Sequence, residues 1–553
     1  MHPIIRRFTA ASSALAALAT LTLAQLPIAA PLHEPDCRER RPPPDPTVQL
    51  EYGCYFFGNY VWNDASSAGN VEGRIYWPSS CETSTPPGVH PLVLLMHGDG
   101  HDQLDYGYLM SHLARNGFIA ATISNGGTNL ERTGQALTFL SFIRNHWTHR
   151  LHVANNIGLI GHSRGGEAVL TLARRIGELG LSHNVNAIIS LAPTDNDEGG
   201  GGVHESLDGG ESESFLVIYG TDDEDVYGRC VSGTLPGCGD PAGAPMRTGF
   251  ALYDRAGSEG GTEPFPVYDD VVTKSMLFVE RANHNRWRST CTDGAIFDSL
   301  LSCDTHWNIA KGYMNAFLRW RLRGQKVFKN FFTGRWMPPA VEADGARIHT
   351  QYSEGYGRRV LDNFEQNTWQ TNSLGGSVTS GGAIQVVLEG STWGYEPTST
   401  HDTESLVVTW APPGLAPWLR WSIPNGTTAQ GARFRDVSDF GFFSFRAGQV
   451  FDSSFNAAET PKDLYVEFRD SGNNTSTWVR ASDYAELPYP REAQVLYAGI
   501  LINVAKSAMN TVRIPICDVE GVDLENISEV RLYFSVPGSN SGELLIDNLE
   551  FAN

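Results

Sequence analysis

The segment IGLIGHSRGG, residues 157–166, constrains the fold more than any other part of this sequence. A short apolar run leads directly into Gly-His-Ser-Arg-Gly, and a segment with helical spacing follows. The glycines two positions before and two positions after Ser163 leave room for a tight turn that a β-carbon would obstruct. The pattern therefore predicts that a buried strand ends at Ser163, that a helix begins immediately after it, and that the hydroxyl is exposed at the turn.

Apolar runs and helical segments alternate on both sides of this turn. The expected strands are 71–77, 92–96, 118–124, 157–161, 187–193, 215–220 and 275–282, and the expected helices are 106–115, 134–146, 167–179 and 309–321. Strands that alternate with helices in this way form a mostly parallel sheet with helices on both faces. We therefore expect an α/β domain over residues 51–329.

Beyond about residue 331 the pattern changes to an alternation of polar and apolar residues. The clearest runs are 405–410, 463–470, 529–536 and 543–551, separated by clusters of Gly, Asn, Ser and Pro. Such short alternating runs are typical of antiparallel strands. The sequence predicts an all-β sandwich over residues 357–553, joined to the first domain by a linker at 330–356.

The N-terminus has the features of a cleaved export signal. Arg6 and Arg7 precede a run rich in Ala and Leu that ends at small residues near position 30. We therefore expect residues 1–30 to be a signal peptide and residues 31–50 to be a proline-rich start of the mature chain. No second long apolar run follows, so the expected product is secreted, extracellular or periplasmic, without a stable membrane anchor.

Eight cysteines agree with export, because an even number in a secreted chain suggests disulfides. Short loops favour the pairs Cys54–Cys81, Cys230–Cys238 and Cys291–Cys303, which leaves Cys37 and Cys517 as a long-range pair or as free thiols. No cysteine or histidine spacing suggests a zinc site, and we expect no cofactor to be required for catalysis. The net charge of −21 disfavours nucleic acid as a partner.

Three side chains in the first domain suit nucleophilic catalysis. Ser163 is the expected nucleophile, and His284, shortly after the last expected strand, is the expected base. Asp223 lies in a carboxylate cluster after strand 215–220 and is the expected acid. Asp195, which follows the preceding strand, is an alternative acid, and His306 is an alternative base. The order serine, acid, histidine along the chain is the one expected for a nucleophile turn of this kind.

A second loop can complete the site. The run MHGDG, residues 96–100, follows the expected strand 92–96. In serine hydrolases with such a turn, one N–H that stabilises the oxyanion comes from this loop and another from the residue after the nucleophile. Those amides belong to Asp99 and Arg164. The alternative interpretation is that the two glycines of this loop only form a turn.

GHSRGG, HGDG and the stretch YGYLMSHLARNGFIAATIS resemble a branch of the α/β-hydrolases. This branch includes chlorophyllases, platelet-activating-factor acetylhydrolases, dienelactone-hydrolase-like enzymes and cutinase-like polyester hydrolases. The resemblance extends over residues 71–322 and implies an α/β-hydrolase fold and ester cleavage. Cutinase-like enzymes usually have Met where this chain has Arg164 and an aromatic residue where it has Asp99. In chlorophyllases the acid would map nearer Asp195.

The second domain resembles carbohydrate-binding modules of the galactose-binding, jelly-roll type. VLDNFE near its start and ELLIDNLEF at its end carry the likeness. The resemblance implies a polysaccharide or polyester surface as partner. It also implies a structural calcium ion, with Asp362 or Asp547 as a ligand.

These features together predict a secreted serine carboxylic-ester hydrolase that acts through an acyl-enzyme, on a polymer or cell-wall ester. Keeping the catalyst on a polymer would raise the local substrate concentration. Two other hypotheses remain open. One is a surface- or glycan-binding protein with a vestigial hydrolase domain, and the other is a triad hydrolase of another acyl bond, a peptidase or a thioesterase.

Overall fold

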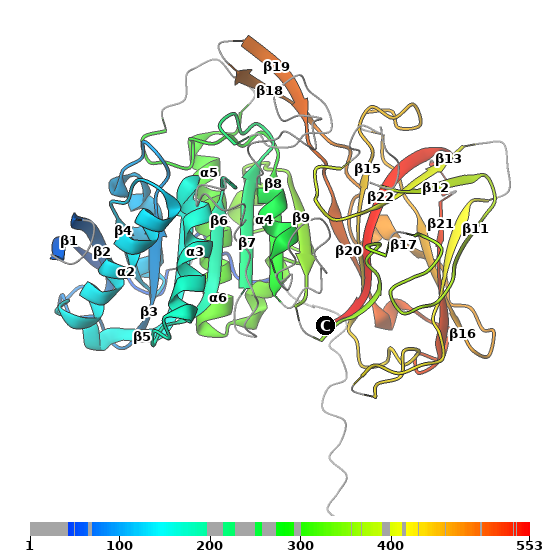
Figure 1. Cartoon of the computed structure of the whole chain (residues 1–553), viewed down its shortest axis with the longest axis horizontal. Coiled ribbons are helices and arrows are strands. Elements are labelled where there is room, and N and C mark those ends of the chain that lie inside the picture. Colours follow the sequence, from blue (N-terminus) through cyan, green and yellow to red (C-terminus); the bar gives the residue numbers. More distant parts are fainter. Residues whose placement is uncertain are drawn as a thin grey trace, which may run out of the picture.

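The computed structural model describes residues 42–48, 50–64, 69–195, 214–226, 249–256, 272–291, 300–355, 357–366, 368–389, 399–411, 416–429, 431–458, 460–497, 500–534, 536–537 and 539–553. Two regions stand side by side in Figure 1, an α/β region and a β region. The predicted signal peptide, Cys37 and the predicted Cys230–Cys238 pair lie outside the described residues.

The α/β region is built on one sheet of nine strands in the order β1-β2-β4-β3-β5-β6-β7-β8-β9. The strands are β1 Cys54–Asp64, β2 Gly69–Ser79, β3 His90–Met96, β4 Ile119–Ile123, β5 Val153–His162, β6 Asn184–Leu191, β7 Ser214–Gly220, β8 Thr273–Val279 and β9 Ile348–Ser353. The pairs from β4 across to β8 are parallel. The pairs that add β1, β2 and β9 at the two edges are antiparallel.

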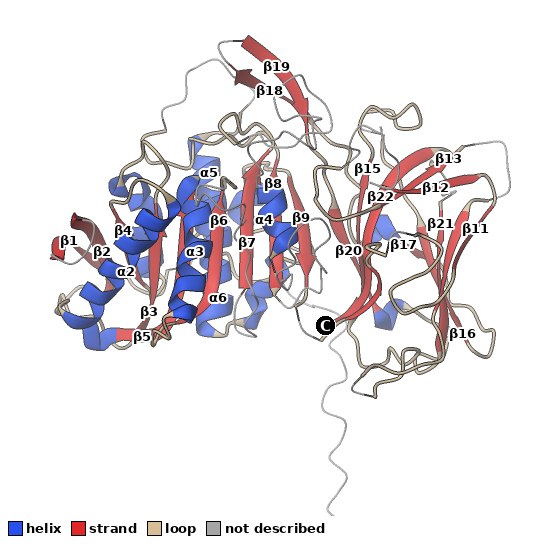
Figure 2. Ribbon diagram, in the orientation of Figure 1, coloured by secondary structure: helices blue, strands red, loops and turns tan. Residues whose placement is uncertain are grey.

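Helices cover both faces of this sheet (Figure 2). They are α1 Gly107–Arg115, α2 Asn129–Asn145, α3 Arg164–Glu178, α4 Gly249–Arg255, α5 Cys303–Ile309, the π-helical η3 Ala310–Met314, α6 Asn315–Arg323 and α7 Pro339–Ala343. Short 3-10 turns are η1 Gln103–Tyr106, η2 Arg150–His152 and η4 Lys326–Phe331.

Successive residues of β3 show how the two faces are filled. Leu94 packs into a core that includes Phe139 of α2, whereas Leu95 packs into a second core that includes Phe317 of α6. All four side chains are buried. Because successive strand residues point to opposite faces, a strand between two helical layers needs apolar residues at every position. This explains why the central strands appear in the sequence as continuous apolar runs.

Most predicted elements of the α/β region are present with shifted ends. Helix α2 begins five residues before the expected start, because Thr128 and Glu131 form a capping box at its N-terminus. The predicted linker at 330–356 contains α7 and β9, and β9 pairs with β8 as the last strand of the sheet. Strand β1 and helix α4 had no counterpart among the expected elements. The prediction of a linker at 330–356 was wrong, because β9 is part of the sheet. The centre of the sheet is parallel, as predicted.

The β region consists of two antiparallel sheets and one hairpin. Its strands are β10 Arg359–Asp362, β11 Val378–Gly381, β12 Ile384–Leu388, β13 Leu406–Trp410, β14 Trp418–Ser422, β15 Phe442–Gln449, β16 Tyr465–Asp470, β17 Val479–Arg480, β18 Glu492–Tyr497, β19 Ile500–Ala505, β20 Asn510–Pro515, β21 Ile527–Tyr533 and β22 Gly542–Ala552. One sheet has the order β12-β13-β22-β15-β20 with β10 beside β22, and the other has the order β11-β14-β21-β16-β17. Among the strands that the structure describes, β18 and β19 pair only with each other.

Both sheets contribute to one apolar core. Trp421 of β14 and Val530 of β21 share it with Phe443 of β15 and Leu544 of β22. The four side chains are fully buried. Two antiparallel sheets that bury their inner faces against each other form a sandwich. The jelly-roll and carbohydrate-binding interpretations of this region stay predictions.

A buried polar network joins the two regions. Asp254 of α4 accepts a hydrogen bond from His401 Nδ1 at 2.8 Å, and the other ring nitrogen lies 3.1 Å from Gln351 Nε2 of β9. Arg446 of β15 donates to Gln351 Oε1 at 2.9 Å and also binds Asp547 of β22. Burial of a charged group is favourable only where it is paired, so this network fixes how the two regions meet.

The two carboxylates proposed as calcium ligands are engaged by protein donors. Asp362 accepts hydrogen bonds from Trp421 Nε1 at 2.7 Å and Gln366 Nε2 at 2.6 Å. Asp547 accepts from Arg446 and Thr403. Across the described residues, no group of three or more His, Cys, Asp or Glu side chains could hold a metal ion. These donor sets do not fit calcium at either carboxylate as the structure has them.

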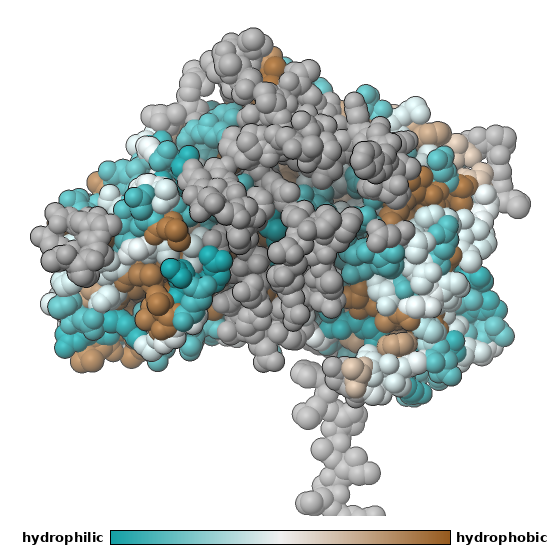
Figure 3. Space-filling model, viewed as in Figure 1, coloured by the Kyte–Doolittle hydropathy of each residue, from teal (hydrophilic) through white to brown (hydrophobic). Residues whose placement is uncertain are grey.

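Polar and apolar residues are interspersed on the face drawn in Figure 3. Among the helices that the structure describes, none is long and apolar enough to cross a membrane.

Candidate active site

Ser163 lies on a strained turn between β5 and α3. Its backbone has φ 56° and ψ −126°, a left-handed conformation that is rare outside glycine. The turn is held by hydrogen bonds from Ser163 N–H to Leu191 O at 3.0 Å and from Gly166 N–H to Ser163 O at 2.8 Å. Strain of this kind persists only where the surroundings impose it, and it is common at catalytic positions.

The neighbouring glycines are required by close backbone contacts. A β-carbon at Gly161 would lie 2.0 Å from Gly165 O, and one at Gly165 would lie 2.2 Å from Met96 O. Both positions therefore exclude any side chain. The close approach to Met96 also brings the end of β3 against the start of α3, so the loop after β3 faces Ser163.

The His284 ring is held by Asp223. His284 Nδ1 lies 2.9 Å from Asp223 Oδ2 and 3.1 Å from Oδ1, and both side chains are buried. Asp223 Oδ1 also accepts the N–H groups of Asp225 at 3.1 Å and Val226 at 2.8 Å. These contacts fix the carboxylate and, when Nδ1 carries the proton, leave His284 Nε2 able to act as a base.

The alternative acid lies elsewhere. Asp195 is 2% exposed, and its Oδ1 accepts a hydrogen bond from Arg255 Nη2 of α4 at 2.7 Å. Both Asp195 and Asp223 follow parallel strands and so lie at the same edge of the sheet. The difference is that Asp223 follows β7, which pairs directly with β8, the strand before His284.

Three imidazole rings lie beside one another at this edge. The ring centroids of His162 and His284 are 4.9 Å apart, and those of His162 and His101 are 4.8 Å apart. The Tyr106 hydroxyl lies between two of them, 2.7 Å from His162 Nδ1 and 3.0 Å from His101 Nδ1. This hydroxyl can donate to one ring and accept from the other, which fixes both rings beside Ser163.

The three imidazoles differ in their affinity for protons. Burial lowers the pKa of His101 to about 4 and lowers the pKa of His162 well below its ordinary value. Burial also lowers the pKa of His284, but the Asp223 carboxylate, with Asp225 and Glu224 nearby, more than offsets it and raises the pKa to about 9. His284 is therefore the imidazole of the three that holds a proton readily, and it is the one paired with a carboxylate.

Hydrogen bonds from Asn125 and Arg132 hold the loop after β3 in place. Asn125, two residues after the end of β4, accepts the N–H of His97 at 2.9 Å and donates its backbone N–H to His97 Nε2 at 3.1 Å. Arg132 of α2 is fully buried and donates to His97 O at 2.9 Å and to Asp99 Oδ1 at 3.2 Å. A β-carbon at Gly98 would lie 2.7 Å from Ser163 Cβ, so this loop touches the serine.

Asp99 follows the residue that touches Ser163, and Arg164 follows Ser163 in the chain. Their side chains point outward, since the Asp99 carboxylate is 68% exposed and its Oδ2 lies 4.0 Å from Arg164 Nε. The Arg164 amide is at the first position of α3, where the N–H groups and the helix dipole favour negative charge.

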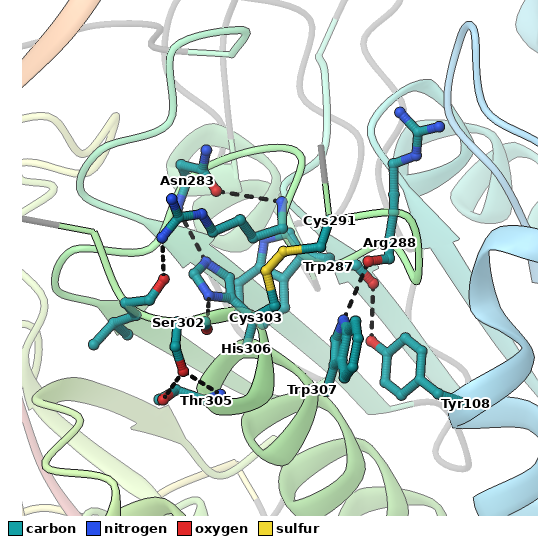
Figure 4. The surroundings of a disulfide bond; sticks show 12 residues. Tyr108, Asn283, Trp287, Arg288, Cys291, Ser302, Cys303, Thr305, His306 and Trp307 are labelled. Carbon is teal, nitrogen blue, oxygen red and sulfur yellow. Dashed lines mark hydrogen bonds between the residues drawn. A yellow bond between two sulfur atoms is a disulfide. The ribbon is translucent and has the colours of Figure 1, made fainter. Parts of the chain in front are cut away.

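The loop that carries His284 is tied to α5 (Figure 4). A disulfide joins Cys291 to Cys303, the first residue of α5, as the short loop predicted. His306 Nε2 accepts the N–H of Asn283 at 3.3 Å, and its Nδ1 lies 2.8 Å from Ser302 O. His306, the alternative base, therefore contacts the loop that carries His284 through the Asn283 backbone. The predicted Cys54–Cys81 disulfide is also present.

Sequence reasoning missed several residues that hold the site in place. Asn125 had a detectable signal, because it is a polar residue two positions after a buried parallel strand, at the edge where the other candidates meet. Tyr106 and Arg132 had none, since their roles depend on how helices pack against the sheet. Lys506, a buried residue of the β region whose Nζ lies 3.5 Å from Thr221 O, also had no signal in the sequence.

Comparisons with known proteins agree with these features. The model of the chlorophyllase family matches residues 74–217. Chlorophyllase-2 of Arabidopsis thaliana is 29% identical over 140 residues, which cover 21% of this chain and 43% of that relative. The chain therefore aligns with less than half of the relative's length. The segment matched by the family model includes Ser163 and the loop after β3 but ends before Asp223 and His284. The likeness supports an α/β-hydrolase fold and, in general, a carboxylic-ester hydrolase.

Proposed function

We propose that this protein is a secreted serine hydrolase that cleaves carboxylic esters through an acyl-enzyme on Ser163. The observation that carries the proposal is the pairing of His284 Nδ1 with the Asp223 carboxylate at 2.9 Å, at the same sheet edge as the strained Ser163 turn. A serine, a buried histidine and a buried carboxylate grouped in this way form the constellation of a catalytic triad.

The reaction would proceed in two halves. His284 Nε2 takes the proton of Ser163 as its oxygen attacks the ester carbonyl carbon, and the Asp223 carboxylate stabilises the imidazolium. The negative charge that develops on the carbonyl oxygen is accepted by the amides of Asp99 and Arg164, each contributing about 3 kcal/mol by analogy with measured donors. His284 then returns the proton to the leaving alkoxide, which departs as the alcohol.

Water completes the cycle. His284 takes a proton from the water molecule as the water oxygen attacks the acyl carbon, and it returns a proton to Ser163 Oγ as the acid is released. The rings of His101 and His162, whose pKa values burial lowers, lie against His284 and add no charge beside it at neutral pH. Because every proton that leaves the serine or the water is returned through His284, the cycle needs no other acid or base.

The test compares the mature protein with Ser163→Ala on p-nitrophenyl acetate and butyrate. Ser141→Ala is the matched control, because Ser141 lies exposed on α2 away from the site. We expect Ser163→Ala to lose at least about a thousandfold in kcat and Ser141→Ala to match the wild type. A fluorophosphonate should label the wild type at Ser163. Equal activity of the three proteins would refute the proposal, and a substrate panel with feruloyl, acetyl-xylan, polyester and chlorophyll esters would follow a positive result.

A further inference from the structure

The β region sends one segment into the α/β region. The hairpin of β18 and β19 stands at the top of Figure 1, above the α/β region, and residues 505–509 lead from it into β20. All five of these residues are buried, and Ala508 packs into the same apolar core as β3 and β5. The segment is therefore a part of the interface and not a surface loop.

Lys506 is the charged residue of this segment. It is 2% exposed, its Nζ lies 3.5 Å from Thr221 O, and it also lies 5.0 Å from the centre of the Tyr219 ring. Tyr219 donates a hydrogen bond to Val226 O, and the Val226 N–H is one of the donors that hold Asp223 Oδ1. The ammonium thus reaches the base of the loop that carries the proposed acid.

This loop carries four consecutive carboxylic acids, Asp222, Asp223, Glu224 and Asp225. Burial raises the pKa of Asp222, which also lies 3.4 Å from Arg491 of the β region. Burial raises the pKa of Glu224 to about 7, and the charge of Asp223 adds to this effect. Like charges so close together destabilise one another, so a cation beside the loop stabilises this run of carboxylates.

Lys506 can supply such a cation. Burial lowers its pKa to about 8, against the opposing attraction of Asp223, Asp222 and Glu224. The side chain is therefore largely protonated at neutral pH. The described groups that face it are the Thr221 carbonyl, the Tyr219 ring and these three carboxylates.

We propose that Lys506 is a positioning residue for the catalytic acid, supplied by the β region, whose ammonium balances the carboxylates around Asp223. The inference rests on the proposed function. Without this charge the run of carboxylates would act on His284 unopposed and raise its pKa further, so a smaller fraction of the ring would be neutral and able to act as a base at a given pH. The described groups that face His284 are Asp223, Glu224 and Asp225 from the loop after β7, and the rings of His162 at the end of β5 and His101 after β3.

The experiment measures kcat/KM for p-nitrophenyl butyrate against pH in the full-length mature protein. Lys506→Met keeps the bulk and removes the charge, Lys506→Arg keeps the charge, and Lys326→Met, at an exposed position, is the matched control. We expect the acidic limb of the Lys506→Met profile to move upward by about one pH unit. The activity at pH 7 should fall about tenfold and recover at high pH, whereas Lys506→Arg and Lys326→Met should follow the wild type.

A second set of variants tests the charge balance itself. Glu224→Gln removes one carboxylate, so alone it should move the acidic limb downward, and in combination with Lys506→Met it should return the limb toward the wild-type position. Circular dichroism and Tm show whether Lys506→Met has folded. If it has not, the Glu224→Gln variant alone provides the test. A Glu224→Gln limb that moves upward or stays in place would then overturn the inference.

Other results separate this inference from the proposed function. If Ser163→Ala keeps wild-type activity, the proposed function fails and the inference fails with it. If Ser163→Ala is inactive while folded Lys506→Met follows the wild type at every pH, only the role of Lys506 is overturned. Equal losses in Lys506→Met and Lys506→Arg at all pH values would show that Lys506 only fills space at the interface.

Discussion

Replacing the two candidate acids one at a time gives the most discriminating test of the site. Asp223→Asn keeps the size of the side chain but removes the charge beside His284. The gap between the His284 pKa of about 9 and its ordinary 6.5 corresponds to about 3 kcal/mol in favour of the imidazolium. Because burial alone would lower this pKa, the carboxylates contribute more than the gap itself. The imidazolium forms in the transition state. Losing about 3 kcal/mol of its stabilisation therefore lowers kcat by at least about a hundredfold.

The asparagine also holds the wrong tautomer of His284, since its amide can donate to Nδ1 where the carboxylate only accepts. A loss of about ten-thousandfold is typical when both effects combine. Asp195→Asn should behave in the opposite way. It breaks the buried pair with Arg255 at 2.7 Å and so lowers the free energy of unfolding by about 3–5 kcal/mol. Its activity per folded molecule should remain within about tenfold of the wild type.

The assay is kcat/KM on p-nitrophenyl butyrate, normalised to the concentration of folded protein from circular dichroism, with Tm measured in parallel. Normalisation separates a fall in activity from a fall in the folded fraction. The assignment of Asp223 is refuted if Asp223→Asn stays within tenfold of the wild type while folded Asp195→Asn is nearly inactive.

Further predictions concern pH, the turn and the disulfide. Only neutral His284 can accept the Ser163 proton, so kcat/KM should rise from pH 7 through about 9, and a flat profile would contradict the assigned base. Because this pKa is raised on folding, its contribution to stability is complete below pH 6.5 and is lost as pH rises through 9, which urea unfolding at several pH values would measure. Gly161→Ala, whose β-carbon would meet Gly165 O, should lower Tm and abolish activity; unchanged activity would disprove the close packing. Removing the disulfide with Cys291→Ser and Cys303→Ser should lower kcat clearly but Tm only slightly, because the bridge chiefly holds the His284 loop.

The elements that local rules determine were predictable from the sequence. The Ser163 turn follows from two glycines and an apolar run, and the structure explains both glycines by contacts shorter than any β-carbon tolerates. The two described disulfides close short loops, where the ends of the chain meet without help from the rest of the fold. The strand ends, and with them the edge where the candidates meet, follow from continuous apolar runs.

The local sequence pattern favours Asp223 as the acid but leaves Asp195 open as an alternative. Each follows a buried strand of similar composition, so both are expected at the same edge. The contact of His284 with Asp223 follows from the strand order, because β7 lies directly beside β8, whereas β6 lies one strand further away, at a spacing of about 4.8 Å per strand. Strand order is a property of the whole sheet, and the residues on either side of an aspartate do not encode it.

Contacts between the two regions are even harder to predict from a sequence pattern than strand order is. Lys506 meets Thr221 across 285 residues, and His401 meets Asp254 across 147. Each is a polar residue in an otherwise ordinary strand or loop, and only the joined fold buries it. Because a buried charge without its partner is strongly destabilising, neither region can expose this surface without a cost in stability. The two predicted domains are therefore joined by buried polar contacts, and under the proposed function the β region contributes to the environment of the candidate acid.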